Sequence, residues 1–309
     1  MGYRNIYIKS ASKLSLKDNS LIVTKDDNQQ IAIPLEDVAS LLIEDKKTVV
    51  TTRLLSALAE YYITMIVCDD SYLPASITLP LNMHYKQLGV FKMQCEVKKP
   101  VLNQVWSRII DAKISNHLSV INKYVSNEEV EERINQERKA IQSGDKTNRE
   151  AVCAKMVFNA LYGRTFIRNH NNHDPINSAM NYGYSLLAGH ASRVLCMYGF
   201  NTNIGIHHDS LNNNNNLSYD FVEPFRAYVD EYIYCNLDNL TSPLSVDTRK
   251  GLINLLQTKT LINNKYYSLQ FAIEEMIKSY IDVLKTEDSS KLLLPKMEVI
   301  EEDENTNEL

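Results

Sequence analysis

Two segments of the sequence carry side chains that could act together in catalysis. The first runs from Gly205 to Asp209, contains two adjacent histidines, and is followed by the carboxylates of Asp220 and Glu223. Their three-residue spacing puts the two carboxylates on the same side of a helical turn. Pro224 disfavours a regular helix at Glu223, so we expect a local distortion that directs this carboxylate. An ion pair between Glu223 and Arg226 is the competing interpretation.

The second segment is a helix expected at residues 147–162, with Glu150 near its start. Ala154, Val157 and Leu161 share one face at the spacing that points inward. Glu150 heads this stripe, where a carboxylate is costly unless it is paired or bound to a metal. The simpler alternative is a half-exposed residue that interacts with the helix N-terminus.

One imidazole with two or three carboxylates suits Mg²⁺ or Mn²⁺ with open water positions better than structural zinc, which usually recruits thiolates. Such an ion orients an attacking oxygen and stabilises the charge that develops in phosphodiester chemistry. The sequence contains no Walker phosphate loop, no Gly-x-Gly-x-x-Gly and no Gly-x-Ser-x-Gly. These residues therefore predict a metal-dependent nuclease more readily than an ATPase, a dehydrogenase or a serine hydrolase.

The hydrophobic pattern of the sequence has two different periods, one typical of strands and one typical of helices, in the two parts of the chain that must position these side chains. Up to residue 74, short β-type runs alternate with Asp/Asn turns of the hairpin type, and Thr51-Thr52 can cap one helix. Residues 75–99 are expected to be a linker with a connecting helix, and residues 100–286 have a helical period. Helices are expected at residues 147–162, 175–198, 220–236 and 268–285. The predicted fold is α+β: a small β-rich domain (1–74) followed by a larger all-α catalytic domain (100–286).

The net charge of −5 argues at first against a nucleic-acid partner. However, residues 298–309 hold six acidic groups and no basic one, and the rest of the chain has 33 basic and 32 acidic residues. Any DNA surface must therefore be a local patch. We expect residues 287–309 to form an acidic, disordered tail. The candidate phosphate contacts, for which a solvated helix end is the simpler interpretation, are Arg164, Arg168, Arg249 and Lys250.

The cysteines and the apolar segments bear on the cellular compartment. The five cysteines are odd in number and widely spaced, with no Cys-x-x-Cys pair, which is typical of reduced thiols. No apolar run approaches the roughly eighteen residues of a membrane span, and the N-terminus lacks the apolar stretch of a secretory signal. We expect a cytoplasmic protein without a membrane partner.

Four stretches together, in their order and spacing, resemble a known family. They are Asn148 to Lys155, Ile176 to Leu187, Gly205 to His208 and Asp220 to Arg226. This combination resembles the CRISPR adaptation integrases, the first of the universal CRISPR-associated proteins. The Asn-Tyr-Gly-Tyr and Gly-Ile-His-His forms look like the type II branch, which accompanies the large RNA-guided nuclease. The resemblance covers roughly residues 1–285; the five asparagines at 212–216 depart from it, so the path of that loop is not predicted.

The resemblance implies the catalytic residues and the reaction. By motif, the catalytic metal ligands fall on Glu150, His208 and Glu223, with Asp220 as an auxiliary and Mg²⁺ or Mn²⁺ as the ion. The 3′-hydroxyl of a short prespacer DNA duplex attacks a phosphodiester at a repeat border of a CRISPR array. One bond breaks as one forms, so this transesterification needs no ATP. If the histidine segment is extended, His207 faces away from the carboxylates and packs, or donates a hydrogen bond behind the ligands.

The resemblance also implies partners. The β-rich domains pair to form homodimers, and a dimer of the second universal adaptation protein bridges two integrase dimers on double-stranded DNA. Other type II adaptation proteins and the RNA-guided nuclease are further expected partners. Two other functions stay open: a stand-alone metal-dependent DNA endonuclease, and a non-catalytic DNA-binding scaffold whose carboxylates are structural ion pairs.

Overall fold

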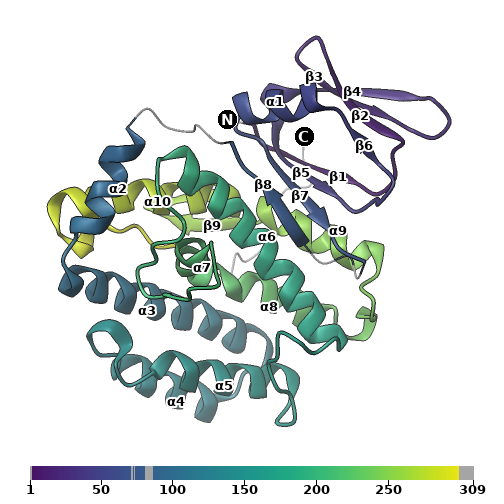
Figure 1. Ribbon diagram of the computed structural model, residues 1–309. Coiled ribbons are helices and arrows are strands. Elements are labelled where there is room, and N and C mark those ends of the chain that lie inside the picture. The colour runs from purple at the N-terminus through teal and green to yellow at the C-terminus, as the bar shows by residue number, and fades with distance from the viewer. Residues whose placement is uncertain (1, 71, 73, 81–85, 299–309) are drawn as a thin grey trace, which may run out of the picture.

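The described residues of the chain, in a computed structural model, are 2–70, 72, 74–80 and 86–298. Most strands gather at one end of the molecule, and α4 and α5 lie farthest from them at the other end (Figure 1). The N-terminal elements are β1 (Arg4–Ile8), β2 (Lys13–Lys17), β3 (Ser20–Thr24), β4 (Gln30–Pro34), β5 (Val38–Ile43), β6 (Val49–Val50), α1 (Thr52–Glu60), β7 (Thr64–Cys68) and β8 (Pro74–Thr78). The predicted α+β class, with a β-rich beginning, is confirmed.

These strands form two four-stranded sheets, with the orders β1-β5-β7-β8 and β4-β3-β2-β6. The turn between β2 and β3 places Asp18 and Asn19 at φ values of 47° and 55°, which suits the Asp/Asn chemistry expected of a hairpin. Thr51 caps α1 as predicted, because its side chain accepts a 3.3 Å hydrogen bond from the amide of Leu54. Leu54 is fully buried in the core between sheet and helix.

Strand β8 was not predicted. Pro74 opens this strand, which pairs antiparallel with β7, so that the sheet continues to Thr78 and beyond the expected boundary at residue 74. Proline is tolerated here because β8 is an edge strand and Pro74 is its first residue.

The remainder is mostly helical. Its elements are α2 (Gln87–Glu96), α3 (Lys99–Tyr124), α4 (Glu128–Lys139), α5 (Arg149–Tyr162), α6 (Pro175–Met197), α7 (Asn216–Val222), α8 (Arg226–Cys235), α9 (Val246–Asn254), β9 (Lys259–Ile262), β10 (Lys265–Ser268) and α10 (Leu269–Thr286). The hairpin β9–β10 is an addition to the part expected to be all-α. The helix expected at 220–236 is interrupted by a 3₁₀ turn at Glu223–Phe225, as the position of Pro224 indicates.

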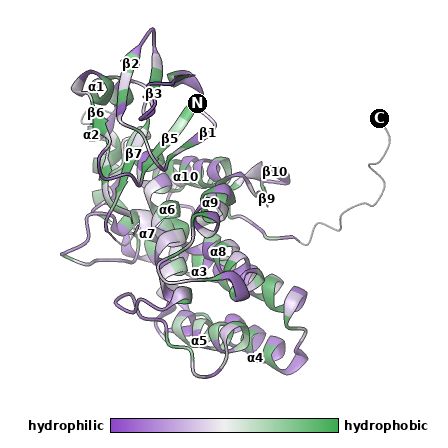
Figure 2. Ribbon diagram, turned by 90° about the vertical axis from the view of Figure 1, so that its right-hand side faces the viewer, coloured by the Kyte–Doolittle hydropathy of each residue, from purple (hydrophilic) through white to green (hydrophobic). Residues whose placement is uncertain are grey.

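Helix α6 is the central element of the helical part and also contacts β7 and β8 of the sheet. It is buried along most of its length. Gly183 allows α6 and α8 to approach closely, because a Cβ at this position would lie 2.5 Å from Val229 Cγ1. In the part of the chain that the structure describes, no helix is long and apolar enough to cross a membrane; the helices carry both hydrophilic and hydrophobic residues (Figure 2).

The expectation of a disordered tail from residue 287 is wrong for residues 287–298. Leu292 is buried, and Lys296 exchanges two backbone hydrogen bonds, of 2.8 and 3.2 Å, with Leu261 of β9. The amide of Met297 donates to Asn116 Oδ1 of α3 at 3.0 Å. Apolar residues anchor this segment before the acidic run begins; residues 299–309 lie outside the described residues.

A buried ion pair joins the sheet to the helical part. Arg249 of α9 donates to both carboxylate oxygens of Glu44, which follows β5, at 2.5 and 2.9 Å. Tyr7 of β1 also donates to this carboxylate. Arg249 is 4% exposed, so the expectation that it contacts DNA phosphates is wrong.

Candidate active site

Glu150 and Glu223 meet at one buried ammonium group. Lys113, in the middle of α3, contacts Glu150 Oε1, and its Nζ lies 2.6 Å from Glu223 Oε2. The side chains of Lys113 and Glu223 are 8% and 5% exposed, and that of Glu150 is 28% exposed. Three elements that are distant in the sequence therefore bring two of the predicted ligands to a single positive charge.

Arg226 gives Glu223 a second cationic neighbour. Its Nη2 lies 2.7 Å from Glu223 Oε1, so the ion pair expected as an alternative is present, together with Lys113. Burial alone would raise the pKa of Glu223, but the charges of Arg226 and Lys113 outweigh it and lower the pKa to about 2. The charge of Lys113 likewise lowers the pKa of Glu150, against the effect of burial. Both carboxylates are ionised at neutral pH.

The 3₁₀ turn at Glu223–Phe225 is fixed to α3. Asn116 lies one helical turn after Lys113, and its Nδ2 donates to the carbonyl of Pro224 at 2.8 Å. Because the turn breaks the helix at this point, Glu223 faces α3, where Lys113 lies.

Asp220 organises the loop that carries the two histidines. Its Oδ1 lies 2.6 Å from Nδ1 of His208, and its carboxylate accepts hydrogen bonds from the amides of Ile206, His207 and His208 at 2.6, 3.2 and 3.2 Å. Gly205 permits this close loop, because a Cβ there would lie 2.2 Å from the carbonyl oxygen of His208. Asp220 thus supports His208 from behind.

The two histidines contact Trp106 of α3 in different ways. His207 stacks on the indole with ring centroids 4.2 Å apart and planes within 3°, whereas His208 meets it edge-on at 5.7 Å. The segment bends at Ile206 and His207 and is not part of a strand, but the two imidazole planes still differ by 85°. Burial lowers the pKa of His208, but its hydrogen bond to Asp220 and the negative charges of Asp220 and Glu223 together outweigh burial, so the pKa is raised.

The donor chemistry of these residues fits a divalent cation. Among the described residues, no group of three or more His, Cys, Asp or Glu side chains is close enough to hold a metal ion as it stands. However, Glu150 and Glu223 already share one positive charge. Among the residues that the structure describes, no donor is well aligned with the buried Oε2 of Glu223, so its contact with Lys113 is electrostatic. A histidine held at Nδ1 by a carboxylate is typical of a metal ligand that binds through its other ring nitrogen.

A pocket of about 660 Å³ opens beside Glu150. Aromatic rings contribute to its lining, and its cationic side chains are Lys113, Lys155, Arg164, Arg168 and Arg226. The structure therefore brings Arg164 and Arg168 close to the candidate site. Lys250 is exposed on α9, outside this lining. Positive charge combined with aromatic faces is a lining that suits nucleic acid.

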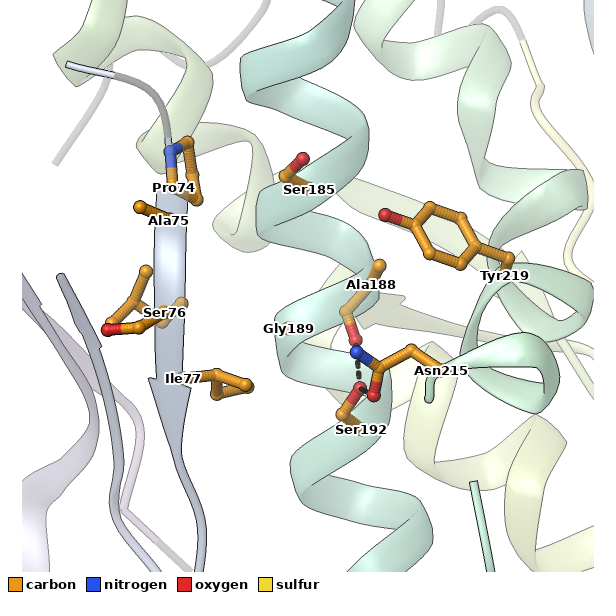
Figure 3. A pocket seen from close by; sticks show the side chains of 11 residues that line it. Pro74, Ala75, Ser76, Ile77, Ser185, Ala188, Gly189, Ser192, Asn215 and Tyr219 are labelled. Carbon is orange, nitrogen blue, oxygen red and sulfur yellow. Dashed lines mark hydrogen bonds between the residues drawn. The ribbon is translucent and has the colours of Figure 1, made fainter. Parts of the chain in front are cut away.

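A second pocket, between β8 and α6, has a volume of about 140 Å³ (Figure 3). Ser192 donates to Asn215 Oδ1 at 3.2 Å on its wall. The described residues of its lining include no carboxylate, imidazole or cationic side chain, so they offer no ligands for the predicted metal.

Lys113 and Trp106 are the site residues that the sequence analysis missed. A signal was available for Lys113, because it follows Ile109 by four residues in the stripe of α3 that faces the core. The argument applied to Glu150, that a charge on an apolar face needs a partner, applies equally to this lysine.

Comparison with known proteins decides the family. A family model described as "CRISPR associated protein Cas1" matches residues 6–243. The chain belongs to the Cas1 family. It is 33% identical over 299 residues to the CRISPR-associated endonuclease Cas1 of Neisseria meningitidis serogroup C (strain 8013), a match that covers 96% of this chain and 97% of that protein. The predicted resemblance to the first universal CRISPR-associated protein is confirmed.

Solved structures share the Cas1 fold at low sequence identity. A Cas1 protein from Thermotoga maritima has a TM-score of 0.75 at 14% identity, and the match covers 92% of this chain and 97% of that one. A casposase bound to its integration product has a TM-score of 0.74 at 15% identity, and the match covers 93% and 92%. At such identities these likenesses show the fold alone.

Proposed function

We propose that this Cas1 protein is a spacer-acquisition integrase that joins the 3′-hydroxyl ends of short prespacer DNA to the repeat borders of a CRISPR array. One observation carries the proposal: Glu150 and Glu223 converge on a single positive charge beside a basic pocket. Membership of a family whose relative is named an endonuclease supports it. The casposase of the same fold, which is bound to an integration product, favours strand transfer over simple cleavage.

The residues that would hold Mg²⁺ or Mn²⁺ are Glu150, His208 and Glu223. When bound, the ion supplies charge stabilisation at the phosphodiester under attack. Asp220 contributes by holding the Nδ1 side of His208, which leaves the other ring nitrogen for a ligand. Arg226 keeps Glu223 ionised.

The pocket would position the DNA. Arg164 and Arg168 offer charges for phosphates, and Arg168 is held in place by Asn177 Oδ1 and Asn181 Oδ1 at 2.9 and 2.7 Å. The rings of Phe158 and Phe166 offer faces for unpaired bases. Lys250, exposed on another face, stays a candidate contact for the longer repeat DNA.

The proposed assembly is a homodimer formed through the β-rich domain, bridged by the second universal adaptation protein on double-stranded DNA. One solved structure of this fold is a Cas6-RT-Cas1–Cas2 complex, with a TM-score of 0.77 at 19% identity, 96% of this chain and 36% of that one. Another is a Cas1–DNA complex, with a TM-score of 0.51 at 16% identity, 92% of this chain and 97% of that one. In the part of the chain that the structure describes, β1 and β8 are the edge strands of their sheet, which supports pairing through the sheet.

A joining assay tests the proposal. The protein, with the second universal adaptation protein, is incubated with Mg²⁺ or Mn²⁺, a labelled duplex and a plasmid that carries a repeat. We expect the label to appear in the plasmid at the repeat borders, and to be absent when the duplex ends in 3′-dideoxynucleotides or when Glu150→Gln is used. Cleavage without joining would indicate the stand-alone endonuclease, and metal-independent binding without either reaction would indicate the scaffold.

A further inference from the structure

Lys113 is a charged residue in an apolar part of α3. Its neighbours Ile109, Ile110 and Ile114 are buried with it. An ammonium group at such a position is costly unless opposite charges compensate it. Burial lowers the pKa of Lys113, but the charges of Glu223 and Glu150 outweigh burial and raise it.

The two proposed ligand carboxylates have cations beside them without an added ion. Two carboxylates, Glu150 and Glu223, face two cations, Lys113 and Arg226. Among the described residues, Arg226 is ion-paired with Glu223 and lies over the ring of Tyr184, with its guanidinium carbon 4.7 Å from the centroid. Lys113 is paired with both carboxylates. It therefore lies where one cation contacts both carboxylates.

A divalent ion and the Lys113 ammonium compete for this position. The Nζ lies 2.6 Å from Glu223 Oε2 and contacts Glu150 Oε1. A divalent ion held by these two carboxylates would repel an ammonium group that contacts both of them. Lys113 also lines the 660 Å³ pocket, and its flexible four-carbon stem gives the head group room to move there.

We propose that Lys113 is a built-in counter-ion, which holds Glu150 and Glu223 together in the metal-free protein and exchanges with the divalent ion by moving into the pocket. The inference rests on the proposed function, because it requires a metal at these carboxylates. In the pocket, the displaced ammonium joins Arg164 and Arg168 and adds a charge that faces a DNA phosphate. Metal binding would thus prepare the pocket for its substrate.

Two measurements on the full-length protein test the exchange. In the first, Lys113→Met is compared with Lys123→Met, a control on the same helix whose lysine is 42% exposed. In EDTA we expect the Tm of Lys113→Met to fall by on the order of 10 °C, and Mn²⁺ to restore most of that loss. Calorimetric titration should show Mn²⁺ bound at least roughly tenfold more tightly than by wild type, about 1.4 kcal/mol. The control Lys123→Met should have the Tm and the Mn²⁺ affinity of the wild-type protein.

The second measurement uses the wild-type protein, so it tests whether Lys113 exchanges with the metal even if Lys113→Met fails to fold. Lysines are acetylated briefly in EDTA or in Mn²⁺, and the rate at each lysine is measured by mass spectrometry. We expect Lys113 to be protected in EDTA and labelled several-fold faster in Mn²⁺, with the rate at Lys123 unchanged. An unchanged Lys113 rate in protein that binds Mn²⁺ would overturn the exchange and leave the proposed function intact. No Mn²⁺ binding by wild type or variant would overturn the metal-dependent function, and the exchange with it.

Discussion

Asp220 Oδ1 lies 2.6 Å from Nδ1 of His208, and the same buried carboxylate accepts the amides of three successive residues. The loop and the imidazole are therefore positioned by one side chain. The neighbouring His207 is held instead by stacking on Trp106. This difference supports separate roles for two histidines that are adjacent in the sequence.

Replacing His208 should cost far more activity than replacing His207. We expect His208→Ala to lower strand transfer by at least about 100-fold, since it removes a ligand, whereas His207→Ala keeps a measurable fraction with unchanged metal dependence. The joining rates of His208→Ala and His207→Ala, compared after both variants are shown to have the same Tm, test this ranking. The reverse ranking would move the catalytic imidazole by one residue.

Removing the charge of Asp220 should weaken metal binding without removing a ligand. In Asp220→Asn the side chain keeps its size, but one acceptor becomes a donor facing the loop amides. We expect Mn²⁺ affinity to fall by about 10- to 100-fold, with a lower Tm. Asp209→Asn, a change at an exposed position of the same loop, is the matched control. Equal Mn²⁺ affinity in the two variants would exclude this role for Asp220.

Glu150→Gln and Glu223→Gln should both abolish strand transfer but differ in stability. Glu223 is the more buried and is ion-paired with two cations, so its loss should cost about 3–5 kcal/mol of unfolding free energy. Glu150 is 28% exposed, and its loss should cost clearly less. Urea denaturation in EDTA measures the difference. Near-normal joining with Mg²⁺ or Mn²⁺ by either variant would remove that residue from the ligand set.

Two truncations should separate the acidic run from the ordered segment before it. Deleting residues 299–309 removes five acidic groups, and we expect stronger DNA binding at low salt, a difference that fades as salt is added. Deleting residues 287–309 also removes the packed Leu292 and Met297 and should lower the Tm. Binding titrations at several salt concentrations and thermal denaturation test the pair. If the deletion of residues 299–309 weakened DNA binding at every salt concentration, the acidic run would instead have a role in binding a partner.

Arg249→Ala should destabilise the whole protein, because Glu44 would be left buried and unpaired. The expected cost is about 3–5 kcal/mol. Lys250→Ala, the next residue but exposed, should leave the unfolding free energy unchanged. Chemical denaturation distinguishes them; similar stabilities would mean that the Glu44 pair does not hold the two parts together.

The sequence was informative where local patterns or motifs carry the structure. The hairpin turn at Asp18-Asn19, the cap at Thr51 and the break at Pro224 all depend on neighbouring residues, and each is present. It was uninformative where a residue's role depends on a partner far along the chain. Arg249 looked like a surface cation because Glu44, 205 residues away, is invisible to local reasoning.

Lys113 shows the same limit within the candidate site. Its position in an apolar stripe could signal a buried charge, but its two partners come from α5 and from the turn after α7. Only the packing of three helical segments reveals that these carboxylates share one cation. The motif resemblance predicts Glu150, His208 and Glu223 as the metal ligands, but it does not give the charges that surround them.

The amide of Asn116 touches two distant parts of the chain. Its Nδ2 donates to the carbonyls of Pro224 and Pro295, at 2.8 and 3.3 Å, and its Oδ1 accepts the amide of Met297. A force that displaces the chain at Met297 therefore also acts, through the Asn116 side chain, on the turn that contains Glu223. An affinity tag or fusion partner is consequently safer at the N-terminus, because a C-terminal attachment acts on the same anchor that holds the turn of Glu223, a proposed metal ligand.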